Sequence, residues 1–150
     1  EKSNFDFFIL KMLKLPIMET VFILQILLSG LVIGIILFQS ILAAPIVFKY
    51  LKPDQSRIFI RKIFPKFFRF LFSIGFVMLL IILIYGEKYK IQYIVGLTTF
   101  ILPIICRLII PAANKATDEN NKNYFRFLHT ISVVLTMLVL ISNAVWLLLV

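Results

Sequence analysis

Long stretches without a charged residue alternate with short basic connections along the chain. No charged residue occurs at positions 20–48, 70–86, 91–106 or 127–150. A helix needs about 20 apolar residues, at about 1.5 Å per residue, to cross the roughly 30 Å hydrocarbon core of a bilayer. The second and third stretches reach this length if Arg69 and Arg107 lie in end turns and extend their side chains to the membrane surface. The pattern predicts four transmembrane helices, at about residues 20–48, 65–86, 91–110 and 127–150.

Composition places the chain in the all-α class of integral membrane proteins. Hydrophobic residues make up 61% of the 150 positions and charged residues 15%, with a mean hydropathy of +1.03. Soluble domains have about 45–50% apolar and about 25% charged residues. The surplus apolar surface must face lipid. We expect a single four-helix transmembrane bundle at residues 20–150, preceded by an N-terminal flank at residues 1–19 that is suited to the membrane surface.

The basic residues are distributed unevenly over the connections. The chain has 16 Lys and Arg against 7 Asp and Glu, for a net charge of +9. Eleven of the 16 lie in the connections at residues 49–69 and 107–126, and five lie on the opposite side. The positive-inside rule places the two basic connections in the cytoplasm or an organellar matrix. We expect a bacterial inner membrane or an organelle membrane, with anionic lipids rather than nucleic acid as the partner of the cations.

The connection before the second helix is basic and amphipathic. Wound as a helix, it places its cations on one half of the circle and apolar residues such as Phe59 and Ile63 on the other. The cations are Arg57, Arg61, Lys62, Lys66 and Arg69. One interpretation is a helix in the head-group plane, broken or kinked near Pro65, with its cations on anionic lipid. The other is a lead-in to the second transmembrane helix, which would start near Pro65.

Three of the four expected helices carry a narrow polar stripe. The stripe residues are Gln25, Ser29, Gln39 and Ser40 on the first helix, Gln92, Thr99 and Arg107 on the third, and His129, Ser132, Thr136 and Asn143 on the fourth. Unpaired polar groups are costly in hydrocarbon, so these stripes should face the interior. They would either hydrogen-bond across helices or line a polar cleft. Gly30 and Gly34 form a separate small-xxx-small pair that permits close packing against a helix of this chain or of a second chain.

The sequence offers no catalytic or metal-binding constellation. All seven acidic residues lie outside the four uncharged stretches, so the sequence offers no carboxylate pair at membrane depth for acid–base chemistry. His129 is the only histidine and Cys106 the only cysteine, which leaves too few ligands for a zinc site or for bis-histidine haem ligation. We therefore expect no enzyme activity, no cofactor and no metal, apart from the weak alternative of a haem shared between His129 and a partner.

Several short motifs resemble one membrane family. They include Ala44-Pro45, the Phe64-Pro65-x-x-Phe68 element, Arg107 with Pro111, the His129-x-x-Ser132 element, and Ser142-Asn143. On these motifs, residues 22–150 resemble the transmembrane protein 205-like family. The resemblance implies four helices and a membrane location, and it implies no reaction.

Two functional hypotheses follow. The first is a non-catalytic membrane protein with a structural or accessory role, present alone, as a homo-oligomer or as a subunit of a larger complex. The second is a small-molecule or ion permease or efflux component, with a polar path between the first, third and fourth helices. The polar stripes are compatible with both.

Overall fold

A computed structural model describes the backbone at residues 2–87 and 89–149 and the side chains at residues 17–87 and 89–149. Every regular element in these ranges is helical. The elements are α1 (Lys2–Leu37), the π-helix η1 (Phe38–Ala43), α2 (Ala44–Tyr50), α3 (Pro53–Tyr85), α4 (Ile91–Asp118) and α5 (Lys122–Leu149). Four helical stretches are long and apolar enough to cross a membrane: Ile17–Tyr50, Pro53–Tyr85, Ile91–Asp118 and Lys122–Leu149. The predicted all-α bundle of four membrane helices is confirmed.

The first helix is longer than the uncharged stretch predicts. α1, η1 and α2 follow one another without a break from Lys2 to Tyr50, so the backbone of the N-terminal flank continues the first membrane helix. In η1 the N–H of Ala44 donates to the carbonyl oxygen of Gln39, five residues earlier, and the next residue, Pro45, has no N–H to donate. Whether the side chains of residues 1–16 face the membrane surface lies outside the described side chains.

The basic connection belongs to α3, and the expected helix start near Pro65 is wrong. α3 starts at Pro53, in a first turn where a missing N–H costs nothing, and the backbone N–H of Lys52 donates to Oε1 of Gln55 over 3.2 Å. Pro65 therefore lies inside a continuous helix, which also rules out a break there. Phe64, Phe67 and Phe68 pack on one another with ring centroids 5.1–6.2 Å apart and support the helix around this proline.

The last two helices also extend past the expected ends. α4 contains Pro103 and Pro111 and continues to Asp118, and α5 starts at Lys122 rather than near Phe127. Asn120, at a φ of 56°, turns the chain between them. Oδ1 of Asn121 accepts a hydrogen bond from the backbone N–H of Tyr124 in the first turn of α5, as a helix-capping residue does.

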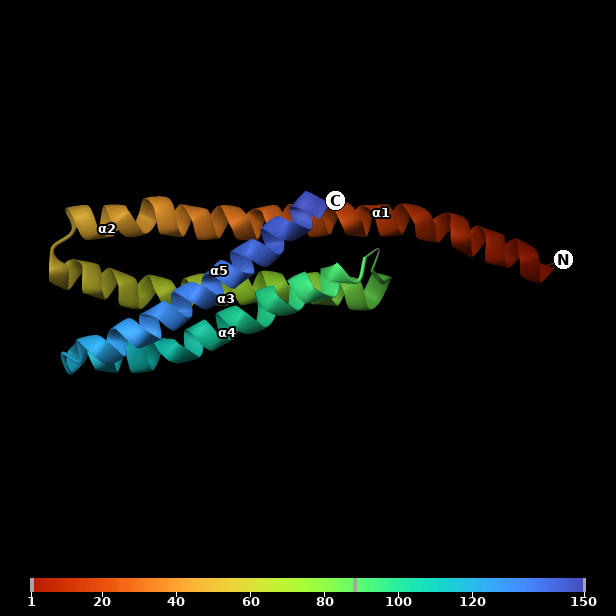
Figure 1. Ribbon diagram of the computed structural model, residues 1–150. Helices are drawn as coiled ribbons and strands as arrows, with labels where there is room; N and C mark the ends of the chain where they lie inside the picture. Colours follow the sequence, from red (N-terminus) through yellow and green to blue (C-terminus); the bar gives the residue numbers. More distant parts are fainter. Residues whose placement is uncertain (1, 88, 150) are drawn as a thin grey trace.

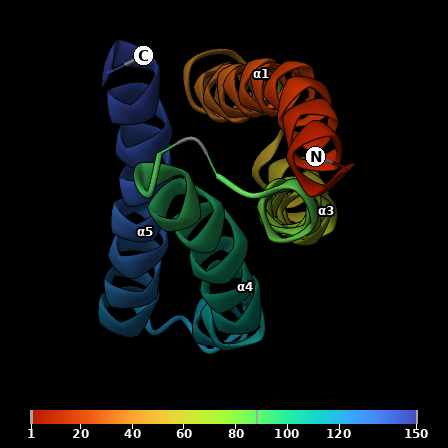
Figure 2. The same ribbon diagram turned by 90° about the vertical axis from the view of Figure 1, so that its right-hand side faces the viewer.

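The helices form an antiparallel bundle in chain order. α3 packs along α4, α4 along α5, and α1 lies against both α5 and α3 (Figures 1 and 2). The α2–α3 and α4–α5 connections lie at one end, which we call the basic end, and the α3–α4 connection and the C-terminus lie at the other (Figure 1). The buried core includes Val32, Ile36, Leu71, Met78 and Val139.

The tight glycine contacts in the bundle are between α3 and α4. A Cβ atom added at Gly75 would lie 2.4 Å from the backbone nitrogen of Phe100, and one at Gly96 would lie 2.8 Å from Cδ2 of Leu79. The predicted pair, Gly30 and Gly34, has nothing within 4 Å of such an atom, and both residues are exposed. Of the two alternatives for this pair, packing against a helix of this chain is not observed, and packing against a second chain stays a prediction.

Candidate functional site

The predicted polar residues separate into two groups at different heights in the bundle. Gln25, Ser29, Gln92, Thr99 and Asn143 are all at most 1% exposed and form a buried polar group. Gln39, Ser40, His129, Ser132 and Thr136 line a cavity nearer the basic end. Arg107 belongs to neither group. It is half-buried, with its guanidinium carbon 5.9 Å from the centroid of the Phe72 ring on α3.

The buried polar group joins helices through hydrogen bonds. Nε2 of Gln25 on α1 donates to the carbonyl oxygen of Met78 on α3 over 2.8 Å. Nδ2 of Asn143 on α5 donates to Oγ1 of Thr99 on α4, also over 2.8 Å. The hydroxyls of Thr98 and Ser142 add a second link between α4 and α5, at 2.9 Å. For Gln25, Thr99 and Asn143, the predicted hydrogen bonding across helices is present.

An aromatic cluster lies beside this group, at the end away from the basic end. The indole of Trp146 packs edge-on against Phe22 at 5.8 Å and against Tyr89 at 6.0 Å between ring centroids. Phe22 is about one turn before Gln25 on α1, and Trp146 is about one turn after Asn143 on the antiparallel α5. The cluster therefore holds α1, α5 and the α3–α4 connection together at this end.

Apolar side chains separate the two polar groups. Val32 and Ile36 lie between Ser29 and Gln39 on α1 and have no exposed surface, and Val139 lies between Asn143 and Thr136 on α5 at 1% exposure. The side chains described do not form the continuous polar path that the permease hypothesis expects. In this conformation the bundle is closed at mid-height and hollow toward the basic end.

The space toward the basic end is a cleft of about 460 Å³ between α5 and the continuous helix formed by α1, η1 and α2. Figure 1 shows α5 close to α1 near the C-terminus and increasingly distant from it toward the basic end. Most of the wall is apolar and includes Phe48, Phe64, Phe67, Phe68, Ile109, Ile110, Val133 and Met137. The volume is in the range of about 300–1,000 Å³ that is typical of small-molecule sites.

Arg61 is held at the side of the cleft nearest the basic end. Its Nη2 donates to the carbonyl oxygen of Asn114 over 3.2 Å and pairs with the carboxylate of Asp118, both on α4. The hydrogen bond from Arg61 is the main reason why the pKa of Asp118, which lies beyond the apolar part of α4, is below its ordinary value. A guanidinium has five N–H donors. The two partners on α4 leave other donors of Arg61 unused, and Arg61 lines the cleft.

The hydroxyls that α5 contributes to the cleft are bonded to the backbone of α5. Oγ of Ser132 donates to the carbonyl oxygen of Leu128 over 3.1 Å, and Oγ1 of Thr136 donates to that of Ser132 over 2.7 Å. Both hydroxyls thus donate to their own backbone, a common alternative for short hydroxyl side chains, and the Thr136 hydroxyl also contacts the Cys106 thiol on α4. His129 is exposed and stacks flat on Phe125, with 5.8 Å between ring centroids. Gln39 and Ser40 lie in the π-helix, a feature often found at functional sites.

Sequence reasoning placed Arg61 in the lipid head-group set, did not single out Asn114, and noted Phe64 and Phe68 only as part of a family motif. The helical wheel separates cations from apolar residues, but it does not show which side of α3 meets α4. Within the described part of the chain, no group of three His, Cys, Asp or Glu side chains is arranged to hold a metal ion. The cleft combines one positioned cation, a few acceptors and an apolar body.

Four apolar helices around a one-sided cleft define a small integral membrane protein of the helical-bundle class. The family described as a domain of unknown function (DUF4149) matches residues 27–122, which is more than half of the chain. The protein belongs to this family. The matched region runs from α1 to the start of α5 and contains Gln39, Arg61 and Asn114 of the cleft. Searches of curated proteins and of solved structures gave no match.

Proposed function

We propose that this protein is a non-catalytic membrane protein that binds an amphiphilic molecule with an acidic head and an apolar tail in the cleft. The observation that carries the proposal is the order of the groups along the cleft, with the Arg61 guanidinium toward the basic end and the aromatic and aliphatic wall toward the bundle centre. A positioned cation beside a large apolar surface matches the two parts of such a ligand.

The depth of these groups fits a molecule taken from one leaflet. At about 1.5 Å per residue, Arg61 lies about 37 Å along α3 from Gly86, and Phe68 about 27 Å. With Gly86 at the opposite membrane surface, Arg61 is at head-group level and Phe68 is within the roughly 30 Å hydrocarbon core. A ligand in the cleft would thus have the same head-out, tail-in orientation as the lipids around it.

Sidedness and the finer family assignment are parts of the same proposal. The excess of Lys and Arg at the basic end supports a cytoplasmic or matrix location for the mouth of the cleft, in a bacterial inner membrane or an organelle membrane. The transmembrane protein 205-like resemblance is supported by the position of two of its motifs, since Phe64 with Phe68 and His129 with Ser132 line the cleft together. Transport of the ligand remains an alternative, and it would require the apolar layer of Val32, Ile36 and Val139 to open.

Photolabelling tests the cleft directly. A diazirine-labelled palmitic acid is added to the protein in nanodiscs, and adducts are mapped by mass spectrometry. We expect adducts on the cleft walls of α3 and α5. Met137→Trp should reduce them by filling the cleft, whereas Leu138→Trp, its exposed neighbour, should not. Equal labelling of the two variants, or labelling confined to outward-facing residues, would contradict the proposal.

Two variants of the Arg61–Asp118 ion pair distinguish recognition of an acidic head group from a general loss of structure. Both Arg61→Gln and Asp118→Asn remove the ion pair between these residues, but Arg61→Gln also removes the cation, whereas Asp118→Asn keeps the cation and removes the competing carboxylate. If Arg61 binds the ligand head, Arg61→Gln should weaken palmitic acid labelling, and Asp118→Asn should preserve or strengthen it. If both variants lose labelling equally, the pair acts only on the structure and the acidic-head part of the proposal is wrong.

A second candidate function is that of an accessory subunit, for which the face of α1 that carries Gly30 and Gly34 is the supporting observation. This face is exposed, and a Cβ atom at either glycine would meet nothing within 4 Å. Small residues facing outward allow another helix to approach the backbone closely. Native mass spectrometry from mild detergent should show a complex that the Gly30→Leu and Gly34→Leu double variant loses. A wild-type protein that is only monomeric would remove the support for this role.

A further inference from the structure

The cations that the sequence groups together lie on two sides of α3. Arg57 and Arg61 are on the side that faces α4, where both charges contribute to the lowered pKa of Asp118, and Arg61 also lines the cleft. Lys62, Lys66 and Arg69 fall within about 60° of arc on the other side, at 100° per residue. The positive charge of the first pair therefore faces α4 within the bundle, and that of the other three residues faces the outside of the bundle.

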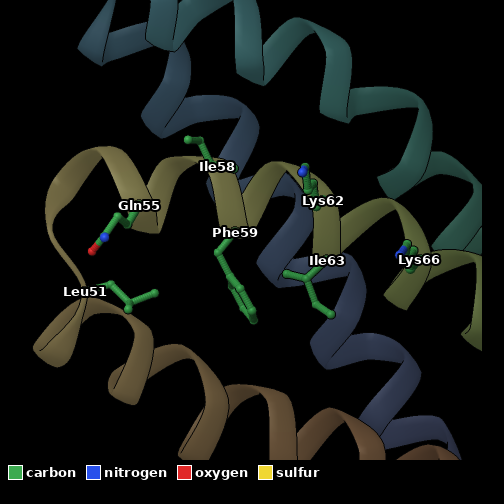
Figure 3. Close-up of a pocket in the computed structure, with 7 residues that line it drawn as sticks. All are labelled: Leu51, Gln55, Ile58, Phe59, Lys62, Ile63 and Lys66. Carbon is green, nitrogen blue, oxygen red and sulfur yellow. The ribbon is translucent and has the colours of Figure 1, made fainter.

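Lys62 and Lys66 line a second hollow, separate from the cleft. This hollow has a volume of about 540 Å³, and Leu51, Gln55, Ile58, Phe59 and Ile63 complete its lining. Figure 3 shows the two lysines one turn apart on α3, with Phe59 and Ile63 projecting toward the helix that precedes Leu51. None of these residues lines the cleft, because the two cavities lie on opposite sides of α3.

The two lysines carry unneutralised charge. Both are exposed, and neither has an ion-pair partner among the described side chains, in contrast to Arg61 with Asp118 and Lys115 with Glu119. Two ammonium groups one turn apart repel each other. An anion placed between them would relieve this repulsion.

The height of the lysines identifies the source of that anion. Lys66 and Lys62 lie about 30 Å and about 36 Å along α3 from Gly86, at about 1.5 Å per residue. The hydrocarbon core is roughly 30 Å thick and the head-group layer adds roughly 5–7 Å on each side. Both ammonium groups thus lie at the level of lipid phosphates on the basic side.

An exposed apolar track continues from the lysines toward the membrane centre. Phe70, Val77 and Leu80 lie on the same side of α3 as Lys66 and are 52%, 43% and 38% exposed. These positions recur at the spacing of one helix face. An acyl chain attached to a phosphate at Lys66 would run directly along them.

We propose that Lys62, Lys66 and the adjoining hollow form a specific site for one anionic phospholipid of the bilayer, with its phosphate between the two ammonium groups and an acyl chain along Phe70 and Val77. The hollow receives the outer part of the head group, and the walls of Phe59 and Ile63 limit the site to one molecule. The site is independent of the ligand in the cleft, since the two share no lining residue.

Native mass spectrometry of the detergent-purified chain tests the site. Phosphatidylglycerol and phosphatidylcholine are titrated separately. We expect one saturable phosphatidylglycerol adduct and weaker phosphatidylcholine binding. The double variant Lys62→Gln, Lys66→Gln should weaken the phosphatidylglycerol adduct roughly tenfold or more, because both cations near the surface are lost. Lys62→Arg with Lys66→Arg should restore it.

The matched control is the double variant Lys49→Gln, Lys122→Gln, which removes the same charge from two exposed lysines at the same end. It should leave the adduct unchanged, and glycerol 3-phosphate should not displace the lipid. An equal loss in the control, or equal binding of both lipids, would show charge attraction without a site and overturn the proposal. Thermal unfolding of each variant, measured alongside, identifies any loss that comes from misfolding.

Arg61→Gln should leave this adduct intact, so failure of the cleft proposal and failure of this one are distinguishable.

Discussion

The amide of Asn143 on α5 donates to the hydroxyl oxygen of Thr99 on α4 over 2.8 Å, and neither side chain is exposed. The same amide nitrogen donates to the carbonyl oxygen of Val139 on its own helix, over 2.9 Å. The two donor positions of one amide group therefore hold a helix to its neighbour and to itself. In a membrane, where apolar burial does little to associate helices, such a contact helps to fix the register of α4 against α5.

The first prediction concerns the strength of this contact. Asn143→Ala and Thr99→Val should each destabilise the bundle, and a double-mutant cycle should give a coupling of about 0.6 kcal/mol, and at most about 1.7 kcal/mol, as for other hydrogen bonds between membrane helices. The measurement is unfolding in SDS from mixed micelles. Ser73→Ala serves as a control, because the Ser73 hydroxyl is exposed and bonds only to its own helix. A coupling of zero would mean that the two side chains do not interact in the folded protein.

The second prediction compares two glycines. Gly75→Ala should destabilise the bundle by about 1–3 kcal/mol, the usual range for overpacking, because the new methyl group would meet the backbone at Thr99 and Phe100, which cannot move aside. Gly30→Ala should leave stability unchanged or raise it slightly, since the position is open and alanine favours the helix. Thermal unfolding of the pair in one detergent checks both. If the two variants are equally stable, α3 and α4 are not in the close contact described.

The four-helix bundle could be predicted because charge is costly in hydrocarbon, so each membrane helix appears in the sequence as a long stretch without a charged residue. The helix ends could not, because charged turns such as Arg57–Lys62 and proline-containing segments such as that around Pro65 remain helical beyond the apolar part. Backbone hydrogen bonds and packing of the flanking phenylalanines decide those boundaries. Neither the backbone hydrogen bonds nor the packing of the phenylalanines can be inferred from composition.

The candidate site was predictable in its residue types and not in its arrangement. A stripe on a helical wheel shows that Gln25 and Gln39 share a face, but it does not show that one meets Met78 and the other a cleft. The difference arises from the divergence of α5 from α1, which depends on packing between helices. The ion pair of Arg61 with Asp118 and the tight contact at Gly75 were missed for the same reason, since both depend on which neighbour each face of α3 meets.

The third prediction uses the single cysteine. Cys106 is 1% exposed, with its Sγ 3.7 Å from the carbonyl oxygen of Ser132. It should react with a maleimide far more slowly in the folded bundle than after unfolding in SDS, since reagent must reach it through packed helices. The rate of labelling then reports opening between α4 and α5. Asn143→Ala should raise the rate and Ser73→Ala should not. Fast labelling of the unmodified folded protein would mean that these helices separate readily.

The last prediction rests on two neighbours in the sequence that line different cavities. Arg61 lines the cleft and Lys62 lines the hollow on the other side of α3. Each is changed to Gln, so the lost charge is the same. Arg61→Gln should reduce palmitic acid labelling and leave the phosphatidylglycerol adduct unchanged, and Lys62→Gln should do the reverse. General electrostatic attraction would instead make both variants lose both ligands to the same extent, because the two residues are adjacent and their backbone positions differ by only about 1.5 Å along the helix axis. Opposite losses from adjacent residues can arise only if the helix divides the two ligands between its sides.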